Sequence, residues 1–175
     1  MRFSSPKAIA FLLLAALSAS PASGEETREL DSHEHGHVTM QIAVDGSDVA
    51  IALEAPGENI VGFEHAPASD EQRAAVDAAL KQLENGSAIV TLPPDAQCEQ
   101  TSTRAELHQD GDHMAFEAAY AFACENISAL GSVETGLFEL YPSIEEIDVE
   151  YATPAGQGAA ELEADDPVVA LGTSN

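Results

Sequence analysis

Alternation of apolar and polar residues around one tight turn constrains the fold of this chain more than any other feature. Large apolar side chains occupy every second position of residues 38–44 and again of residues 49–53. The dipeptide Asp45-Gly46 lies between the two segments, and Asp-Gly between alternating segments is a strong signal for a β-hairpin. We therefore expect two antiparallel strands at the start of the folded part, ending at Pro56-Gly57.

One amphipathic helix is expected after this hairpin, beyond a loop at residues 57–67. Ser69 and Gln72 have the spacing of a capping box, in which the hydroxyl of the first residue caps the new helix. Apolar residues at helical spacing continue to about Glu84, and Asn85-Gly86 predicts a left-handed exit. This helix is expected to pack on a sheet.

Short strands are expected through the rest of the chain. The segments with strand character are residues 88–92, 100–107, 114–124, 135–140, 144–151, 159–163 and 168–171. The alanines of residues 114–124 also allow a helix there. Together, these expected strands and the one long helix predict an α+β fold that is mainly antiparallel β, in a single domain over residues 37–172.

The only two cysteines, Cys98 and Cys124, are expected to form a disulfide. A hairpin turning at Asp110-Gly111 would set Cys98 opposite Ala123, and one bulge would bring it opposite Cys124. The Cα spacing must still suit the bond, which would stabilise the fold by about 3 kcal/mol. Zinc ligation by this distant pair is the alternative.

The N-terminal segment is typical of a secretory signal peptide. Arg2 and Lys7 precede an apolar run at residues 8–17, and small residues follow this run as far as Gly24. The run is far shorter than the roughly 20 residues that span a bilayer. We expect a signal peptide at residues 1–24, a flexible acidic and histidine-bearing arm at residues 25–36, and a soluble monomer in the periplasm. An oxidising compartment would favour the disulfide.

The charge of the chain excludes two classes of partner. It has 31 acidic side chains against 6 basic ones, and no Lys or Arg follows Arg104. Such a surface repels phosphate backbones and anionic lipid head groups, so we expect neither nucleic-acid binding nor a polybasic contact with a membrane. No apolar stretch after residue 17 is long enough to span a bilayer, so we also expect no membrane insertion of the mature chain. The acidic side chains solvate the surface, or attract cations weakly and without selectivity.

A string of alternating histidines, His33-Glu34-His35-Gly36-His37, is the main candidate for metal binding. Residues two apart on an extended chain point the same way with Cα atoms about 6.6 Å apart, so His35 and His37 can close on one Zn²⁺. His33 and His37 would stand about 13 Å apart, and Gly36 is the residue that could supply a bend. A polar arm without metal is the alternative.

Further ligands are expected from two later segments. Glu64 and His65 lie in the loop after the first hairpin, which returns the chain to the end where it began. His108 and His113 flank a turn that also carries two carboxylates, and a solvated hairpin tip is the alternative there. Imidazole with carboxylate suits Zn²⁺, with other divalent transition metals competing.

Catalysis has little support in the sequence, which contains no HExxH, no GxSxG and no phosphate-binding loop. We therefore expect a protein that is not an enzyme. A metal-dependent hydrolase remains an alternative, since an open coordination position beside a pocket would suffice for it. A metal-free interaction module is the other alternative.

Several of these motifs are shared with a known family. HEHGH at 33–37, GFEHAP at 62–67, AQC at 96–98, residues 116–124 and GQG at 156–158 resemble the ZrgA-like zinc-regulated periplasmic zinc-binding proteins. The resemblance implies binding of Zn²⁺ in the periplasm to buffer or deliver it, in support of uptake by an ABC-type system. Family members often carry a long His/Asp-rich insertion between the strands that end in the cysteines, and here it is reduced to residues 108–113.

Overall fold

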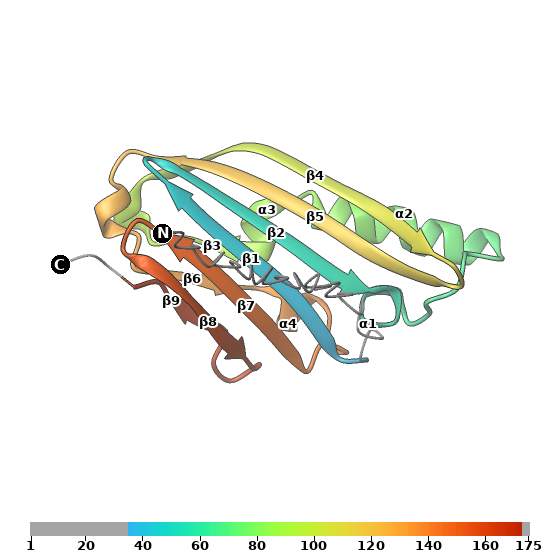
Figure 1. Ribbon diagram of the computed structural model, residues 1–175. Coiled ribbons are helices and arrows are strands. Elements are labelled where there is room, and N and C mark those ends of the chain that lie inside the picture. The colour runs from blue at the N-terminus through green and yellow to red at the C-terminus, as the bar shows by residue number, and fades with distance from the viewer. Residues whose placement is uncertain (1–34, 173–175) are drawn as a thin grey trace, which may run out of the picture. The chain divides into compact units, whose positions relative to one another are not determined.

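A computed structural model describes residues 35–172, and within them a six-stranded sheet dominates. The expected signal peptide, most of the expected arm and His33 lie outside the described residues. The strands run in the order β4-β5-β2-β1-β7-β8. Their bounds are β1 His37–Asp45, β2 Asp48–Pro56, β4 Cys98–Asp110, β5 His113–Cys124, β7 Glu146–Thr153 and β8 Gly156–Leu162. Figure 1 shows them side by side as arrows.

The predicted hairpin of β1 and β2 is confirmed, and its turn lies at Gly46-Ser47, one residue later than the predicted Asp45-Gly46. Asp45 pairs with Asp48, and Gly46 adopts a φ of +61°, which a tight turn requires and glycine adopts readily. Apolar residues of both strands are buried on one face, while the residues between them are exposed on the other. We call this second surface of the six-stranded sheet, on which the exposed residues of β1 and β2 lie, the open face.

The second layer covers the buried face of this sheet. It consists of short strands and four α-helices that share one hydrophobic core with the large sheet. The elements are β3 Val90–Thr91, β6 Ser132–Thr135, β9 Val168–Ala170, α1 Gly57–Val61, α2 Asp70–Leu83, α3 Gly86–Ile89 and α4 Leu137–Leu140, with short 3-10 helices at Pro94–Ala96 and Ile127–Ala129. The described residues are thus mostly β, as predicted.

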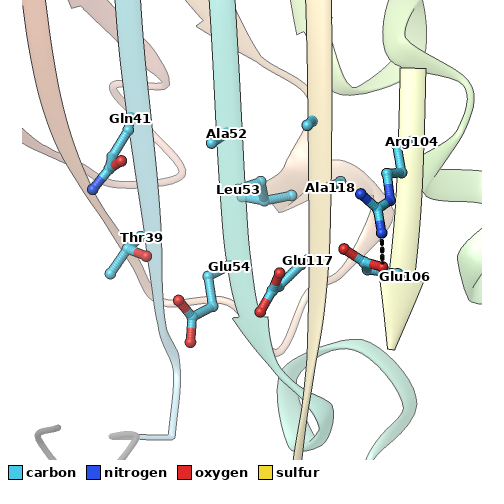
Figure 2. A pocket seen from close by; sticks show the side chains of 10 residues that line it. Thr39, Gln41, Ala52, Leu53, Glu54, Arg104, Glu106, Glu117 and Ala118 are labelled. Carbon is cyan, nitrogen blue, oxygen red and sulfur yellow. Dashed lines mark hydrogen bonds and ion pairs between the residues drawn. The ribbon is translucent and has the colours of Figure 1, made fainter. Parts of the chain in front are cut away.

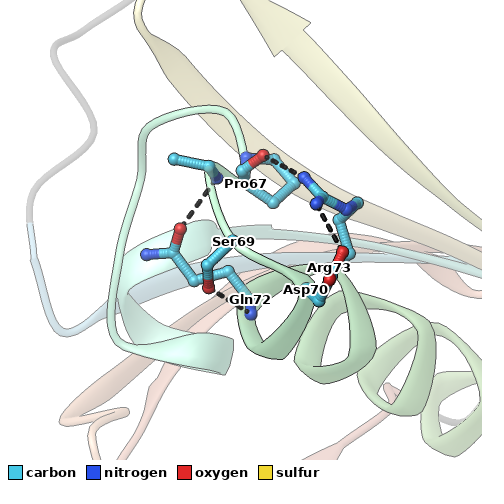
Figure 3. A network of polar contacts seen from close by, with 6 residues as sticks. Pro67, Ser69, Asp70, Gln72 and Arg73 are labelled. Atoms are coloured by element: carbon cyan, nitrogen blue, oxygen red, sulfur yellow. Dashed lines mark hydrogen bonds and ion pairs between the residues drawn. The ribbon is translucent and has the colours of Figure 1, made fainter.

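Helix α2 is 14 residues long, and its start follows the predicted capping residues. The backbone N–H of Gln72 donates to the hydroxyl of Ser69 at 3.2 Å, and the side chain of Gln72 accepts from the N–H of Ala68 at 2.8 Å (Figure 3). The helix is fixed to the sheet near its other end, where the buried hydroxyl of Tyr120 donates to the carbonyl of Leu83 at 2.8 Å. Burial raises the pKa of this hydroxyl.

The predicted disulfide between Cys98 and Cys124 is confirmed, as is the bulge that it required. The register of β4 and β5 shifts between Gln100 and Ser102, and this shift brings the two cysteines opposite each other. The hairpin turns one residue later than predicted, because Asp110 pairs with His113. Residues 114–124 form a strand and not a helix.

Four local predictions are wrong, and tertiary contacts explain them. Part of the expected loop at 57–67 is helix α1, and the expected strand at 88–92 begins as helix α3. The expected strand at 135–140 stops at Thr135, and helix α4 begins at Leu137. The hydroxyl of Thr135 donates to the carbonyl of Ile89 and accepts from the N–H of Leu137. Gly86 does not adopt the predicted left-handed conformation after α2, but is the first residue of α3. A Cβ at Gly86 would clash with the side chain of Gln100.

One pairing departs from the antiparallel pattern. Strand β1 pairs with β7 in parallel, so His37 lies beside Glu146 and Thr39 beside Asp148. No turn joins these strands, which are far apart in the sequence, so local patterns give no sign of the pairing. Within residues 35–172 the structure contains no helix long and apolar enough to cross a membrane.

Candidate metal centre

The segment His35-Gly36-His37 is held by one buried side chain, that of Asn59 in α1. Its Oδ1 accepts from the N–H of Gly36 at 2.9 Å, and its Nδ2 donates to the carbonyl of His37 at 2.8 Å. Asn59 is only 3% exposed, so these bonds satisfy a polar group inside the protein. The histidine segment therefore has a fixed backbone at its entry into β1.

Gly36 has the backbone conformation of a bend, although His33, which a bend here could bring toward His37, lies outside the described residues. Its φ is +90°, and its carbonyl accepts from the N–H groups of Glu145 and Glu146 at 2.8 and 3.1 Å. A Cβ on this residue would lie 3.1 Å from the side chain of Glu145. The bend gives His35 and His37 different acidic partners, Glu64 and Glu146.

His37, Glu146 and Asp148 form a three-residue group that we call the strand triad. Among the described residues, their ligand atoms all lie within 4.8 Å of one another, and His37 Nδ1 is 3.3 Å from Glu146 Oε1. The parallel register of β1 and β7 accounts for this, since it places His37 beside Glu146 and two carboxylates on one face of β7. Two ligands of a tetrahedral Zn²⁺ with bonds of 2.0–2.1 Å lie about 3.3 Å apart.

A second group, which we call the loop cluster, gathers around the carboxylate of Glu64. His35 Nε2 lies 3.5 Å and His113 Nδ1 lies 3.2 Å from the same oxygen, Glu64 Oε2. Hydrogen bonding to His113, and more weakly to His35, holds the pKa of Glu64 below its ordinary value, against a smaller opposing effect of burial. The structure thus brings together three of the residues that the sequence nominated, from three separate segments.

His65 and His108 lie close to these groups in the sequence but have other surroundings. The ring of His65 stacks on Phe63 with centroids 5.3 Å apart, and its Nδ1 lies 2.9 Å from the carbonyl of Ala66. Because a carbonyl only accepts, this contact leaves Nε2 as the nitrogen suited to a metal. His108 is an exposed residue of β4 that pairs with Ala115.

Glu146 and Asp148 are not among the ligands predicted from the sequence. A signal for them exists, because acidic residues alternate with the buried Ile147 and Val149 and so must share the exposed face of a strand. What the sequence lacks is any local sign that this strand pairs with β1. The partner of His37 therefore follows only from the tertiary structure.

The open face adds a row of carboxylates next to the strand triad. Glu54, Glu117 and Glu106 lie opposite one another on β2, β5 and β4, and Figure 2 shows them side by side with Arg104 paired to Glu106. Thr39 connects this row to Asp148 of the strand triad, because it pairs with Glu54 on one side and Asp148 on the other. Like charges directly opposite one another repel, so this end of the sheet favours cations.

Comparison with known proteins gives one match that covers most of the chain. A family model described as ZrgA family zinc uptake protein matches residues 32–171, which include the strand triad and the loop cluster. A search of curated proteins found no match.

Proposed function

Because the chain belongs to the ZrgA family of zinc uptake proteins, we propose that it binds Zn²⁺ at the strand triad and buffers or delivers the ion in support of uptake. The observation that carries this proposal is the convergence of His37, Glu146 and Asp148 within 4.8 Å. One imidazole and two carboxylates are ligands that Zn²⁺ accepts. In this proposal the ion is cargo and not a permanent part of the fold.

The exposure of the triad supports exchange of the ion. The side chains of His37 and Glu146 are 37% and 29% exposed, so an ion reaches them without unfolding of the sheet. Three protein ligands leave one position of a tetrahedral ion for water or for a ligand from a partner. Structural zinc sites are instead closed by four protein ligands, which suits retention better than delivery.

The same proposal places the protein in the periplasm, as a monomer that serves an ABC-type uptake system. The N-terminal pattern of a signal peptide and the disulfide between Cys98 and Cys124 support an oxidising compartment. We assign the protein no catalytic step, in keeping with a family described by uptake and not by a reaction.

Calorimetric titration of the full chain, purified without a histidine tag, tests the proposal. We expect the variant His37→Ala/Glu146→Gln/Asp148→Asn to lose zinc binding at this site, and acid to release the ion as the imidazole protonates. Glu150→Gln is the matched control, since it removes the next exposed carboxylate of β7. Wild-type binding by the triple variant, or equal loss in the control, would contradict the proposal.

A further inference from the structure

We infer that the open face of the six-stranded sheet is a docking surface for a protein segment that is both basic and apolar. The surface has two parts that meet at Ala52, a hollow with a floor of alanines and a smaller pocket with carboxylates around it. The first suits an apolar side chain, and the second suits a lysine or an arginine. The described residues that line these two parts include none of the strand triad, so docking holds or fails independently of zinc binding.

The floor of the hollow is built from the smallest side chains of neighbouring strands. Exposed residues of adjacent strands form rows across a sheet, because alternate residues share a face. One row crosses β5, β2, β1 and β7 as Ala121, Ala50, Ala43 and Ala152. These residues line a hollow of about 1080 Å³. Since methyl groups stand low above the backbone, a larger apolar side chain from a partner can bury its surface here.

The carboxylate pocket has a volume of about 220 Å³ and adjoins this floor. Glu54 of β2 and Glu117 of β5 lie opposite each other, and Figure 2 shows their carboxylates side by side. Arg104 is the only Lys or Arg of the six strands, and it is paired with Glu106. Within residues 35–172, no Lys or Arg is therefore paired with Glu54 or Glu117.

The charges of the pocket favour a cation from outside the chain. Like charges directly opposite each other destabilise a sheet, and a lysine or arginine between Glu54 and Glu117 would replace this repulsion by attraction. The remaining basic side chains of residues 35–172, Arg73 and Lys81, belong to α2, which packs on the other side of the sheet. The complementary charge must come from a partner.

Charge also disfavours the other occupants of this surface. A second copy of the chain carries the same excess of acid, with 31 acidic side chains against 6 basic ones, so electrostatic repulsion opposes self-association. Phosphate backbones and anionic lipid head groups are repelled for the same reason. A protein partner that combines apolar side chains with a lysine or arginine satisfies both parts of the surface.

The docking surface ends beside the strand triad. Thr39 lines the carboxylate pocket and pairs with Asp148 of the triad. A partner that fills the pocket therefore lies next to the ligand position that three protein ligands leave open on a tetrahedral ion. Under the proposed function, on which this one step rests, such a partner is the recipient of the ion.

Amide ¹H–¹⁵N spectra of the metal-free full chain test the inference, with a peptide of alternating lysine and leucine as the probe. We expect the shifts to concentrate at the open face, with Ala50, Ala52 and Ala119 among the residues affected most. A peptide of alternating lysine and serine, of the same length and charge, should bind about tenfold more weakly, because it has no apolar side chain for the floor.

Two variants examine the two parts of the surface. Glu117→Gln removes a carboxylate of the pocket and should weaken binding of the lysine–leucine peptide by about fivefold. Its matched control is Glu99→Gln, which makes the same change of charge opposite Ala123. Ala52→Gln fills the floor and should weaken binding to a similar extent, whereas Ala74→Gln, at an exposed position of α2, should not.

The outcomes that overturn the inference are distinct from failure of zinc binding. Equal losses in Glu117→Gln and Glu99→Gln would show attraction by net charge alone. Equal affinity for the lysine–serine peptide would show that the alanine floor takes no part. Self-association of the wild type that Ala52→Gln abolishes, measured by analytical ultracentrifugation, would make a second copy the occupant. Zinc titration of Ala52→Gln should match the wild type, so the strand triad is tested separately.

Discussion

The N–H of Gly36 donates to the buried Oδ1 of Asn59 at 2.9 Å, so one interior amide fixes the residue between His35 and His37. Replacement of Asn59 by Ala leaves this N–H and the carbonyl of His37 without their partner. We expect a loss of about 2 kcal/mol in the free energy of unfolding, together with weaker zinc binding. Urea denaturation measures the change in the free energy of unfolding. Asn126→Ala, which removes an exposed amide bonded to Asp95, should cost far less.

Gly36→Ala should be more costly than Gly46→Ala. Both glycines have positive φ, at +90° and +61°, so alanine costs about 1–2 kcal/mol at either position. Only Gly36 also has a neighbour within 4 Å, the side chain of Glu145, which would have to move. We expect Gly36→Ala alone to reduce zinc affinity in calorimetric titration. Equal zinc affinities in the two variants would show that the bend at Gly36 does not position the ligands.

Glu117→Gln should stabilise the protein. Glu117 lies between Glu54 and Glu106 on the open face, and like charges opposite one another on adjacent strands cost up to about 1 kcal/mol. The gain should be largest at low ionic strength and fade as salt screens the charges. Glu99→Gln is the control, since Glu99 lies opposite Ala123. An equal gain in this control would assign the effect to net charge.

His113→Ala should raise the pKa of Glu64 toward its ordinary value, because His113 is the main cause of its depression. A depressed carboxyl pKa stabilises the fold above the unfolded-state pKa, and this contribution is lost as the pH falls through the folded-state value. The variant should therefore titrate at higher pH in carboxyl ¹³C spectra of the metal-free protein. His65→Ala should leave the curve in place, and an unchanged curve in His113→Ala would contradict the contact.

Loss of the disulfide should lower stability by about 3–4 kcal/mol, because the bond closes a loop between residues 26 positions apart. The double variant Cys98→Ser/Cys124→Ser and the reduced wild type should unfold at the same urea concentration. A difference between them would show that serine, and not the loss of the bond, disturbs the paired ends of β4 and β5.

The parts of the fold that could be predicted are those set by neighbours in the sequence. The hairpin at Gly46, the cap at Ser69 and the bulge that pairs Cys98 with Cys124 all follow from short-range patterns. The errors lie where distant contacts prevail. The expected strand at residues 135–140 ends at Thr135, whose hydroxyl donates to the carbonyl of Ile89 and accepts from the N–H of Leu137 at the start of α4.

For the candidate site too, the residue types could be predicted from the sequence, but the contacts between distant segments could not. The sequence nominated His35, Glu64 and His113 from their residue types, although nothing local indicated that they contact one another. It nominated His37 but not Glu146, because the two meet only through the parallel pairing of β1 with β7. Candidate ligands such as Glu146 can be identified only once the neighbouring strands of the sheet are known.

The parallel pairing of β1 and β7 also sets an order of events. A hairpin closes early because its strands are adjacent, whereas positions 37 and 146 must wait until nearly the whole chain has been made. A partly synthesised or unfolded chain therefore carries no assembled strand triad and competes poorly for metal. Under the proposed function, zinc can be acquired at the strand triad only after the sheet is complete, so zinc occupancy of this site would report on successful folding.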